Sequence, residues 1–364
     1  MGSCNFCKVD PTDPNYPLKT CVCGKVSYCS KECQAKDWKN HKPSCPPFAI
    51  RQSPGKGRGL FATRKIKEGQ IIIDEYPLLT SSGVMTQREF EDNIYPFIDD
   101  DTKAKILNLH DPAENLKNLD TDTVEELVSK NNLMLIYREA FDDEFSKIFR
   151  IVGGSLERIC GVKNLYSNKI TDGGLFYTLS LINHACVPNA VDSWVMADFT
   201  RHQVRAVRTI EKDEEILVSY RLENEFVYGS REYRRQKLLE TKGFRCECSE
   251  CSLEGEDLQQ NESMRKGIEE KRVEIEQLLG CPGALPRKFL KKAMKLGQQR
   301  IKLVQKLELR LMFVVEMKNF SGFAILAQNL GVACVNDPGT YKQEAMKYAK
   351  LFGDCFIHAA LLNN

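Results

Sequence analysis

The placement of the cysteines constrains the fold of this chain more than any other feature of its sequence. The chain has 364 residues and 15 cysteines, and seven of the cysteines lie within the first 45 residues. Three more, Cys246, Cys248 and Cys251, lie close together in the second half. The first thirty residues have no apolar signal-peptide core, which disfavours disulfides, and thiols at these spacings are typical of zinc ligands. We therefore expect small zinc-stabilised units.

The first 45 residues offer enough soft ligands for two closed tetrahedral zinc sites. Such a short segment cannot bury a core of its own, so metal must supply the free energy of folding. His41 could be a surface histidine, but its spacing to Cys45 favours a ligand. The eight candidate ligands are Cys4, Cys7, Cys21, Cys23, Cys29, Cys33, His41 and Cys45.

The composition is that of an ordinary globular protein. The sequence is 42% hydrophobic and 28% charged, with a formal net charge of +2. This balance gives no overall attraction to nucleic acid or membrane, so any such bias must be local. No run approaches the roughly 18 apolar residues of a membrane span. We expect a soluble protein of the cytoplasm, the nucleus or both, with no membrane partner.

A second ordered set of residues follows in the middle of the chain. The polar pair Asn183-His184 precedes strand-like runs, and Tyr220 follows shortly after the run at residues 216–218. Taken alone, His184 could be a core histidine and Tyr220 a strand aromatic. The order of the pieces favours a site, because a polar pair, alternating strands, a terminal tyrosine and the cysteine cluster at 246–251 follow one another.

A glycine-rich turn at residues 55–59 joins two short strand-like runs, and a β-branched run follows at residues 71–73. Glycines mark most tight hairpins, so this turn is weak evidence by itself. It does not lead from a strand into a helix, which excludes a dinucleotide-binding fingerprint.

Together these pieces resemble the SET domain of protein lysine methyltransferases. The resemblance implies that Tyr220 is the catalytic residue, that Phe244 stacks on adenine, and that Tyr166 lines the substrate channel. The residues it implies for binding S-adenosylmethionine are Lys56, Gly57, Arg58, Asn164, Asn183, His184, Tyr220 and Phe244.

The N-terminal cysteines resemble a MYND finger, in which the ligand pairs interleave. One departure is that only Val22 separates Cys21 from Cys23. The resemblances imply three structural zinc ions. Their ligand sets are Cys4, Cys7, Cys29 and Cys33; Cys21, Cys23, His41 and Cys45; and Cys186, Cys246, Cys248 and Cys251. We expect the remaining cysteines to be small core residues: Cys160, Cys281, Cys334 and Cys355.

The predicted fold class is α+β: a small twisted β-sheet SET domain with a helical insertion, an N-terminal MYND finger and a helical C-terminal region. The predicted parts are a MYND finger (1–47), the first part of the SET domain (48–80), a helical insertion (81–154), the SET core (155–245), a post-SET zinc motif (246–254) and helices (255–364).

Two helical segments leave alternatives open. In the insertion, Leu127, Met134 and Leu135 recur at helical spacing, and Asp-Pro at 111–112 breaks the run. Its acidic residues 99–101 are a solvated helix cap or a surface that attracts a basic peptide. In the tail, one helix is expected to bury a stripe of apolar residues: Leu290, Met294, Ile301, Val304, Leu307 and Leu311.

Between residues 287 and 310 there are nine Lys or Arg and a single acid, Glu308. This stretch is a solvated face or a docking surface for an acidic partner or a nucleic-acid backbone.

The family that the chain resembles is the SMYD group of lysine methyltransferases. Three departures are visible: the finger precedes the SET domain, Ala185 replaces a more usual serine, and Lys242 stands where relatives have a channel aromatic. The resemblance implies S-adenosylmethionine-dependent methylation of lysine in a histone or non-histone protein. The alternative is a non-catalytic adaptor that binds proline-containing peptides, for example in transcriptional regulation.

Overall fold

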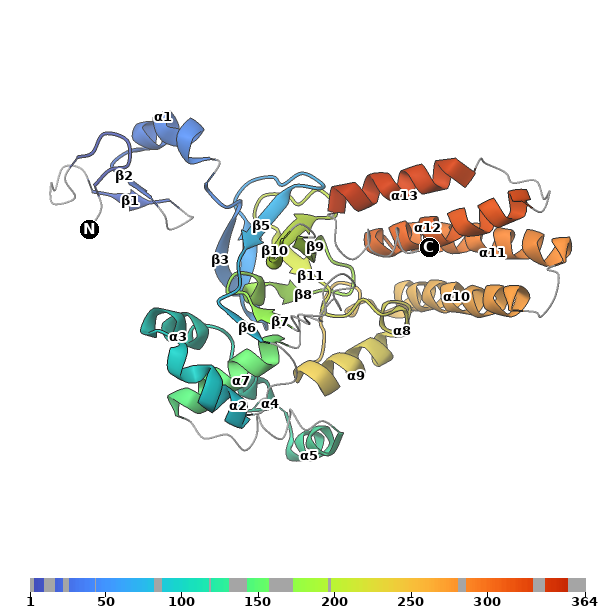
Figure 1. The fold of residues 1–364 in the computed structure, drawn as a ribbon, viewed down its shortest axis with the longest axis horizontal. Coiled ribbons are helices and arrows are strands. Elements are labelled where there is room, and N and C mark those ends of the chain that lie inside the picture. Colours follow the sequence, from blue (N-terminus) through green and yellow to red (C-terminus); the bar gives the residue numbers. More distant parts are fainter. Residues whose placement is uncertain are drawn as a thin grey trace.

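The structure is a computed structural model that describes residues 3–9, 17–21, 26–42, 44–81, 87–117, 119–130, 143–156, 173–195, 198–280, 286–329 and 338–352. Figure 1 shows a small finger at one end of the long axis, a group of short sheets in the middle and a set of helices at the other end. Some residues named above lie outside the described ranges: Cys23, Met134, Leu135, Cys160, Asn164, Tyr166, Cys281, Cys334 and Cys355.

The finger is a two-stranded hairpin followed by one helix. Strand β1 (Lys19–Thr20) pairs antiparallel with β2 (Ser27–Tyr28), and helix α1 (Lys31–His41) follows. Ser30 caps this helix by accepting a hydrogen bond from the backbone N–H of Cys33 at 3.2 Å. The buried cluster of the finger consists of Cys4, Cys21, Tyr28 and Cys45. Such a core is too small to fold by burial alone.

A four-stranded sheet carries several residues that line a cavity. Its strand order is β3-β4-β11-β8, and its strands are β3 (Phe48–Ser53), β4 (Gly57–Ala62), β11 (Glu215–Val218) and β8 (Asn183–His184). The predicted glycine-rich turn closes the antiparallel β3–β4 hairpin. Strand β11 runs parallel to β8, with Val218 opposite His184. This register places Tyr220, two residues beyond β11, beside the polar pair.

Two further sheets complete the middle of the molecule. One has the order β5 (Ile71–Glu75), β10 (Asp198–Ala206) and β9 (Ala190–Val195), all antiparallel. The other pairs β6 (Leu79–Ser81) with β7 (Gly173–Leu175). The strands predicted at 71–73 and 216–218 are confirmed. Ile72, Ile73, Ile216 and Val218 fill one buried cluster with residues of the insertion helices, whereas Ile71 is exposed.

The predicted helical insertion is present in its described part. Its elements are α2 (Gln87–Asn93), η1 (Tyr95–Phe97), α3 (Asp100–Leu107), α4 (Ala113–Lys117), α5 (Thr121–Lys130) and α7 (Glu144–Leu156). Asp99 caps α3 by accepting from the N–H of Thr102 at 2.7 Å, so the acidic residues 99–101 are a helix cap, as the first alternative held. Pro112 immediately precedes α4, as the predicted break requires.

A short 3-10 helix, η2 (Leu179–Leu181), precedes β8. After β11, the described chain is helical, with α8 (Asn224–Val227), α9 (Arg231–Lys242), α10 (Gly255–Leu279), α11 (Arg287–Lys306), α12 (Arg310–Asn329) and α13 (Pro338–Phe352). In Figure 1, α10, α11, α12 and α13 lie side by side at one end of the molecule. No helix in the described part of the chain combines the length and apolar character needed to cross a bilayer.

The prediction of a single helix from Leu290 to Leu311 is wrong. All six residues of the stripe are buried, but α11 ends at Lys306 and α12 begins at Arg310. Glu308 lies between them in the left-handed region, with φ of 54°. The break lets two helices pack against each other, so the apolar positions serve two helices instead of one.

A buried polar triad joins these helices to the middle of the molecule. The Arg300 guanidinium on α11 lies 2.7 Å from a carboxylate oxygen of Glu316 on α12. Tyr228, which follows α8, donates its hydroxyl hydrogen bond to the same oxygen at 2.9 Å. The three side chains are almost fully buried. Removing one charge of such a pair leaves the other uncompensated in a low-dielectric site.

We expect Glu316→Gln to lower the free energy of unfolding by about 3–5 kcal/mol, because Arg300 loses its counter-charge. The matched control is Glu270→Gln, which removes an exposed partner of Lys266 and should cost less than about 1 kcal/mol. Urea unfolding of both variants measures the difference. Equal losses in the two variants would contradict the role assigned to the triad.

Candidate active site and zinc centres

One cavity of about 690 Å³ lies where the hairpin, the polar pair and the end of α9 meet. It collects residues from five separate stretches of the chain, including the insertion. Of the residues predicted to bind S-adenosylmethionine, all that the structure describes line it: Lys56, Gly57, Arg58, Asn183, His184, Tyr220 and Phe244. Asn164 and Tyr166 lie outside the described residues.

Asn183 is held between the hairpin and β11. Its side-chain amide donates to the backbone carbonyl of Arg58 at 3.1 Å and to a carboxylate oxygen of Glu215 at 2.8 Å. Lys56 lies 3.8 Å from the second oxygen of Glu215. These contacts fix the orientation of the hairpin turn at the cavity edge.

His184 connects the cavity to the cysteine cluster behind it. Its Nδ1 accepts a hydrogen bond from the backbone N–H of Tyr220 at 3.0 Å. Because that nitrogen is an acceptor, Nε2 carries the proton of the neutral ring, and Nε2 lies 3.5 Å from the sulfur of Cys186. The ring is 3% exposed. His184 is thus both a buried, hydrogen-bonded histidine and part of the cavity wall.

Tyr220 lies outside β11, so it is not simply a strand aromatic. Its hydroxyl donates to the backbone carbonyl of Ile182 at 2.8 Å. Its ring is perpendicular to that of Phe244, with centroids 6.2 Å apart, and 5.2 Å from the ring of His184. Edge-to-face contacts of this kind hold aromatic rings in place.

The insertion supplies the opposite wall, which the sequence did not predict. Asn115 donates to the backbone carbonyl of Lys242, at the end of α9, at 2.8 Å. Asp111 pairs with the buried Arg150 at 2.7 Å. Burial alone would raise the pKa of Asp111, but its bonds to Arg150 and to the N–H of Ala113 lower it overall. This carboxylate is therefore a fixed negative charge on the wall.

Two further positioning residues, Glu215 and Asn189, were also not predicted. Asn189 is 1% exposed, donates to the carbonyl of Glu215 at 2.7 Å and accepts from the N–H of Leu217 at 2.8 Å. It thereby attaches the loop after His184 to β11. An asparagine directly after a proline in a loop is the only local signal that marked it.

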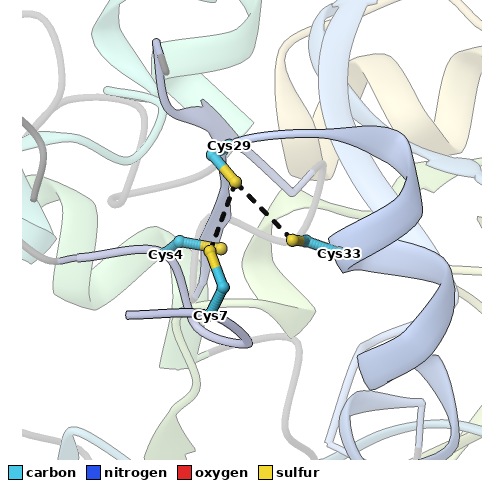
Figure 2. Close-up of side chains that lie close together, drawn as sticks. All are labelled: Cys4, Cys7, Cys29 and Cys33. Carbon is cyan, nitrogen blue, oxygen red and sulfur yellow. Dashed lines mark hydrogen bonds between the residues drawn. The ribbon is translucent and has the colours of Figure 1, made fainter. Parts of the chain in front are cut away.

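The first cysteine group joins the two ends of the finger. The sulfurs of Cys4, Cys7, Cys29 and Cys33 all lie within 4.8 Å of one another. The Cys7–Cys29 and Cys29–Cys33 sulfur distances are 3.4 and 3.6 Å. Figure 2 shows the four sulfurs gathered at one place, with Cys33 projecting from α1. Tetrahedral zinc with Zn–S bonds of about 2.3 Å separates sulfurs by about 3.8 Å, so this group fits zinc.

The second finger group contains Cys21, His41 and Cys45, whose ligand atoms also lie within 4.8 Å of one another. The Cys21 and Cys45 sulfurs are 3.9 Å apart. The fourth predicted ligand, Cys23, lies outside the described residues. The interleaved pairing implied by the MYND resemblance is the one that these groups have.

The third group is fully buried and lies directly behind the cavity. Cys186, Cys246, Cys248 and Cys251 meet there, with the Cys186 and Cys251 sulfurs 3.6 Å apart. Hydrogen bonding to Cys246 raises the pKa of Cys186, and hydrogen bonding with Cys186 lowers the pKa of Cys248. Four such thiols cannot all ionise side by side without a cation, and a zinc ion would allow it.

Comparison with known families agrees with this architecture. The SET domain model matches residues 57–221, and the MYND finger model matches residues 4–45. The match to the MYND finger precedes the match to the SET domain in the sequence.

Several named lysine methyltransferases are similar to this chain. N-lysine methyltransferase SMYD2 of Sus scrofa is 27% identical over 244 residues, which cover 65% of this chain and 48% of SMYD2. Histone-lysine N-methyltransferase SMYD3 of Mus musculus is 27% identical over 270 residues, covering 72% of this chain and 55% of SMYD3. Histone-lysine N-methyltransferase set5 of Schizosaccharomyces pombe is 28% identical over 223 residues, 60% and 54% of the two chains. The chain spans about half the length of these relatives.

Among solved structures, the SET domain of LSMT bound to lysine and AdoHcy is similar to this chain. The alignment covers 90% of this chain and 89% of the LSMT chain. The identity is 11% and the TM-score is 0.36, which is too low to place any residue.

Proposed function

We propose that this protein is an S-adenosylmethionine-dependent protein lysine N-methyltransferase. The observation that carries the proposal is the single cavity lined by the hairpin turn, Asn183, His184, Tyr220 and Phe244. These residues come from distant parts of the chain and were named as cofactor ligands from the SET resemblance alone. The SET domain match over residues 57–221 and the named relatives support the same activity.

The hairpin and Asn183 form the polar side of the proposed cofactor site. Lys56 and Arg58 bring two positive charges to the cavity edge, which suits a carboxylate. Arg58 is itself oriented by the side-chain oxygen of Asn108 at 2.9 Å. Phe244 offers an aromatic face on which an adenine ring can stack. S-adenosylmethionine, when bound, supplies the methyl group on a sulfonium.

Tyr220 is the proposed catalytic residue. Its hydroxyl and the carbonyl of Ile182 lie 2.8 Å apart, so the two oxygens can orient an incoming amine without adding a charge. The amine must be neutral to attack, and the free lysine pKa is about 10.4. An aromatic, desolvated channel penalises its charged form. Aligning two bound reactants contributes about 7–11 kcal/mol to lowering the barrier.

The three cysteine groups are proposed to be structural zinc sites. Each offers a closed ligand set, which leaves no open position for water or substrate in the two fully described groups. Zinc at the third group would anchor Phe244 through Cys246 and His184 through Cys186. We also propose that the protein acts in the cytoplasm, the nucleus or both, because histone-lysine methyltransferases are among its relatives.

Gly59→Ala should weaken cofactor binding and destabilise the fold by about 1–3 kcal/mol. A Cβ at this position would lie 2.9 Å from the amide nitrogen of Asn183 and would also overlap the carboxylate of Glu215. Calorimetric titration with S-adenosylmethionine and the thermal midpoint measure the two effects. Gly322→Ala is the control, because its Cβ would meet no described atom within 4 Å. It should leave the affinity unchanged and should not lower the thermal midpoint, since alanine is favoured over glycine inside helix α12. Wild-type binding by Gly59→Ala would refute this packing role.

Transfer of labelled methyl from S-adenosylmethionine into proteins of a cell extract tests the proposed activity. Labelled bands are expected with zinc-loaded wild-type protein, and the bands identify the acceptors. A zinc-loaded protein that does not bind S-adenosylmethionine would overturn the proposal.

A non-catalytic adaptor is the second candidate, and the position of Lys242 favours it. Lys242 lines the cavity, at a position where the SMYD resemblance implies a channel aromatic. In that case the finger would recruit proline-containing peptides. A pull-down that is unchanged in Tyr220→Phe but lost in Cys29→Ser, together with absent cofactor binding, is the expected result for an adaptor.

Loss of nucleic-acid binding with rising salt would mark a role for the basic residues of α11.

A further inference from the structure

One buried positive charge in the described part of the chain has no carboxylate partner. Arg234, on α9, is 1% exposed, and no carboxylate oxygen among the described residues lies within 4.0 Å of its guanidinium. Its Nη1 donates to the carbonyl of Gly229 at 2.6 Å, and its Nη2 lies 3.9 Å from the sulfur of Cys251. A buried guanidinium without a counter-charge costs several kcal/mol.

The other fully buried arginines of this half of the molecule have carboxylate partners. Arg265 lies 2.9 Å from a carboxylate oxygen of Glu250, and Arg300 lies 2.7 Å from one of Glu316. Arg234 differs from them because the nearest groups that can carry a negative charge are the cysteines of the third group, in their thiolate form.

A zinc ion bound by four thiolates carries two negative charges in excess. The group formed by Cys186, Cys246, Cys248 and Cys251 is buried, so this excess charge is far from water. Its desolvation costs free energy, as does that of the unpaired guanidinium. The two unfavourable charges thus offset each other.

We propose that Arg234 is the counter-charge of the post-SET zinc centre and holds the metal there by stabilising the tetrathiolate. The neighbouring Arg235 acts on the same loop by a different route, since it donates to the backbone carbonyls of Cys246 and Cys251, each at 3.0 Å. Arg235 positions the chain, whereas Arg234 acts on the charge of the sulfur ligands. This inference rests on the zinc site of the proposed function.

Zinc transfer from the folded, full-length protein to a chromophoric chelator tests the proposal. In Arg234→Gln, we expect one of three zinc equivalents to leave about 10–100-fold faster than in wild type, the usual effect of losing a partner of a metal ligand. The other two equivalents should leave at the wild-type rate. Alkylation and peptide mapping should show that the newly reactive thiols are Cys186, Cys246, Cys248 and Cys251.

Three more variants separate charge from shape. Arg234→Met is a second neutral variant that fills similar space, and it should release zinc as fast as Arg234→Gln. Arg234→Lys keeps the positive charge, so its rate of zinc release should be closer to that of wild type. Arg300→Gln is the matched control, because it removes a buried guanidinium whose partner is a carboxylate. It should lower the free energy of unfolding without releasing zinc from the native protein.

Slow release of all three zinc ions from both neutral variants would overturn the role of Arg234, and so would equally fast release from Arg300→Gln. The failure of the underlying zinc site would look different. In that case, the wild-type protein itself would lack zinc on these four cysteines.

Discussion

Tyr220→Phe should lower the rate of methyl transfer by about 10²–10³-fold, the usual loss when one preorganised hydrogen-bonding group is removed from a reacting centre. The change removes one oxygen and leaves the ring in place. The contacts of the ring with Phe244 and His184 are kept, and so is the backbone bond to Nδ1 of His184. Binding of S-adenosylmethionine should therefore stay close to that of wild type.

Single-turnover transfer of labelled methyl and calorimetric binding of S-adenosylmethionine separate the two effects. Tyr233→Phe is the matched control, because Tyr233 is a 39% exposed tyrosine on α9 and lies outside the cavity. Transfer at the wild-type rate by Tyr220→Phe would remove Tyr220 from the proposed mechanism. A parallel loss of binding and transfer would assign it to cofactor binding instead.

Cys248→Ser should abolish zinc binding at the third group and weaken binding of S-adenosylmethionine. Cys246 lies two residues after Phe244, and Cys186 lies two residues after His184, so one metal ion would fix two parts of the cavity wall. Loss of a base-stacking aromatic alone costs about 1–3 kcal/mol, which corresponds to a factor of about 5–150 in affinity.

The zinc content per chain and the affinity for S-adenosylmethionine are the measurements. Cys7→Ser is the matched control, because it removes a sulfur ligand from the finger, none of whose described residues lines the cavity. It should lose zinc without changing the affinity for the cofactor. If Cys248→Ser loses its zinc and still binds S-adenosylmethionine as wild type does, the anchoring role is wrong.

The candidate zinc ligands could be identified from residue type and short spacings, whereas their grouping into three sets was what the MYND and SET resemblances implied. The pairs at Cys4–Cys7 and Cys29–Cys33 come together as the MYND resemblance implied. In the same way, the glycine-rich turn predicted a hairpin, and β3 and β4 form one. Patterns of this kind act over a few residues, so they need no knowledge of the path of the chain.

The tail shows where local periodicity is insufficient. The apolar stripe was identified correctly, yet it belongs to two helices, since the chain turns at Glu308 with φ of 54°. Helical spacing continues across such a turn, and the burial of Leu307 and Leu311 is equally satisfied by one helix or by two. Only the packing of α11 against α12 decides between them.

The sequence by itself determined that this chain has a MYND finger, a SET-type set of cavity residues and cysteines placed for zinc. The tertiary structure alone revealed the partners that position them. Asn183 bonds to Arg58, 125 residues away, and Asn115 bonds to Lys242, 127 residues away. Arg234 meets Cys251 inside a buried centre. Contacts at such separations depend on how the sheets and the insertion pack, and no local pattern of charge or hydrophobicity encodes them.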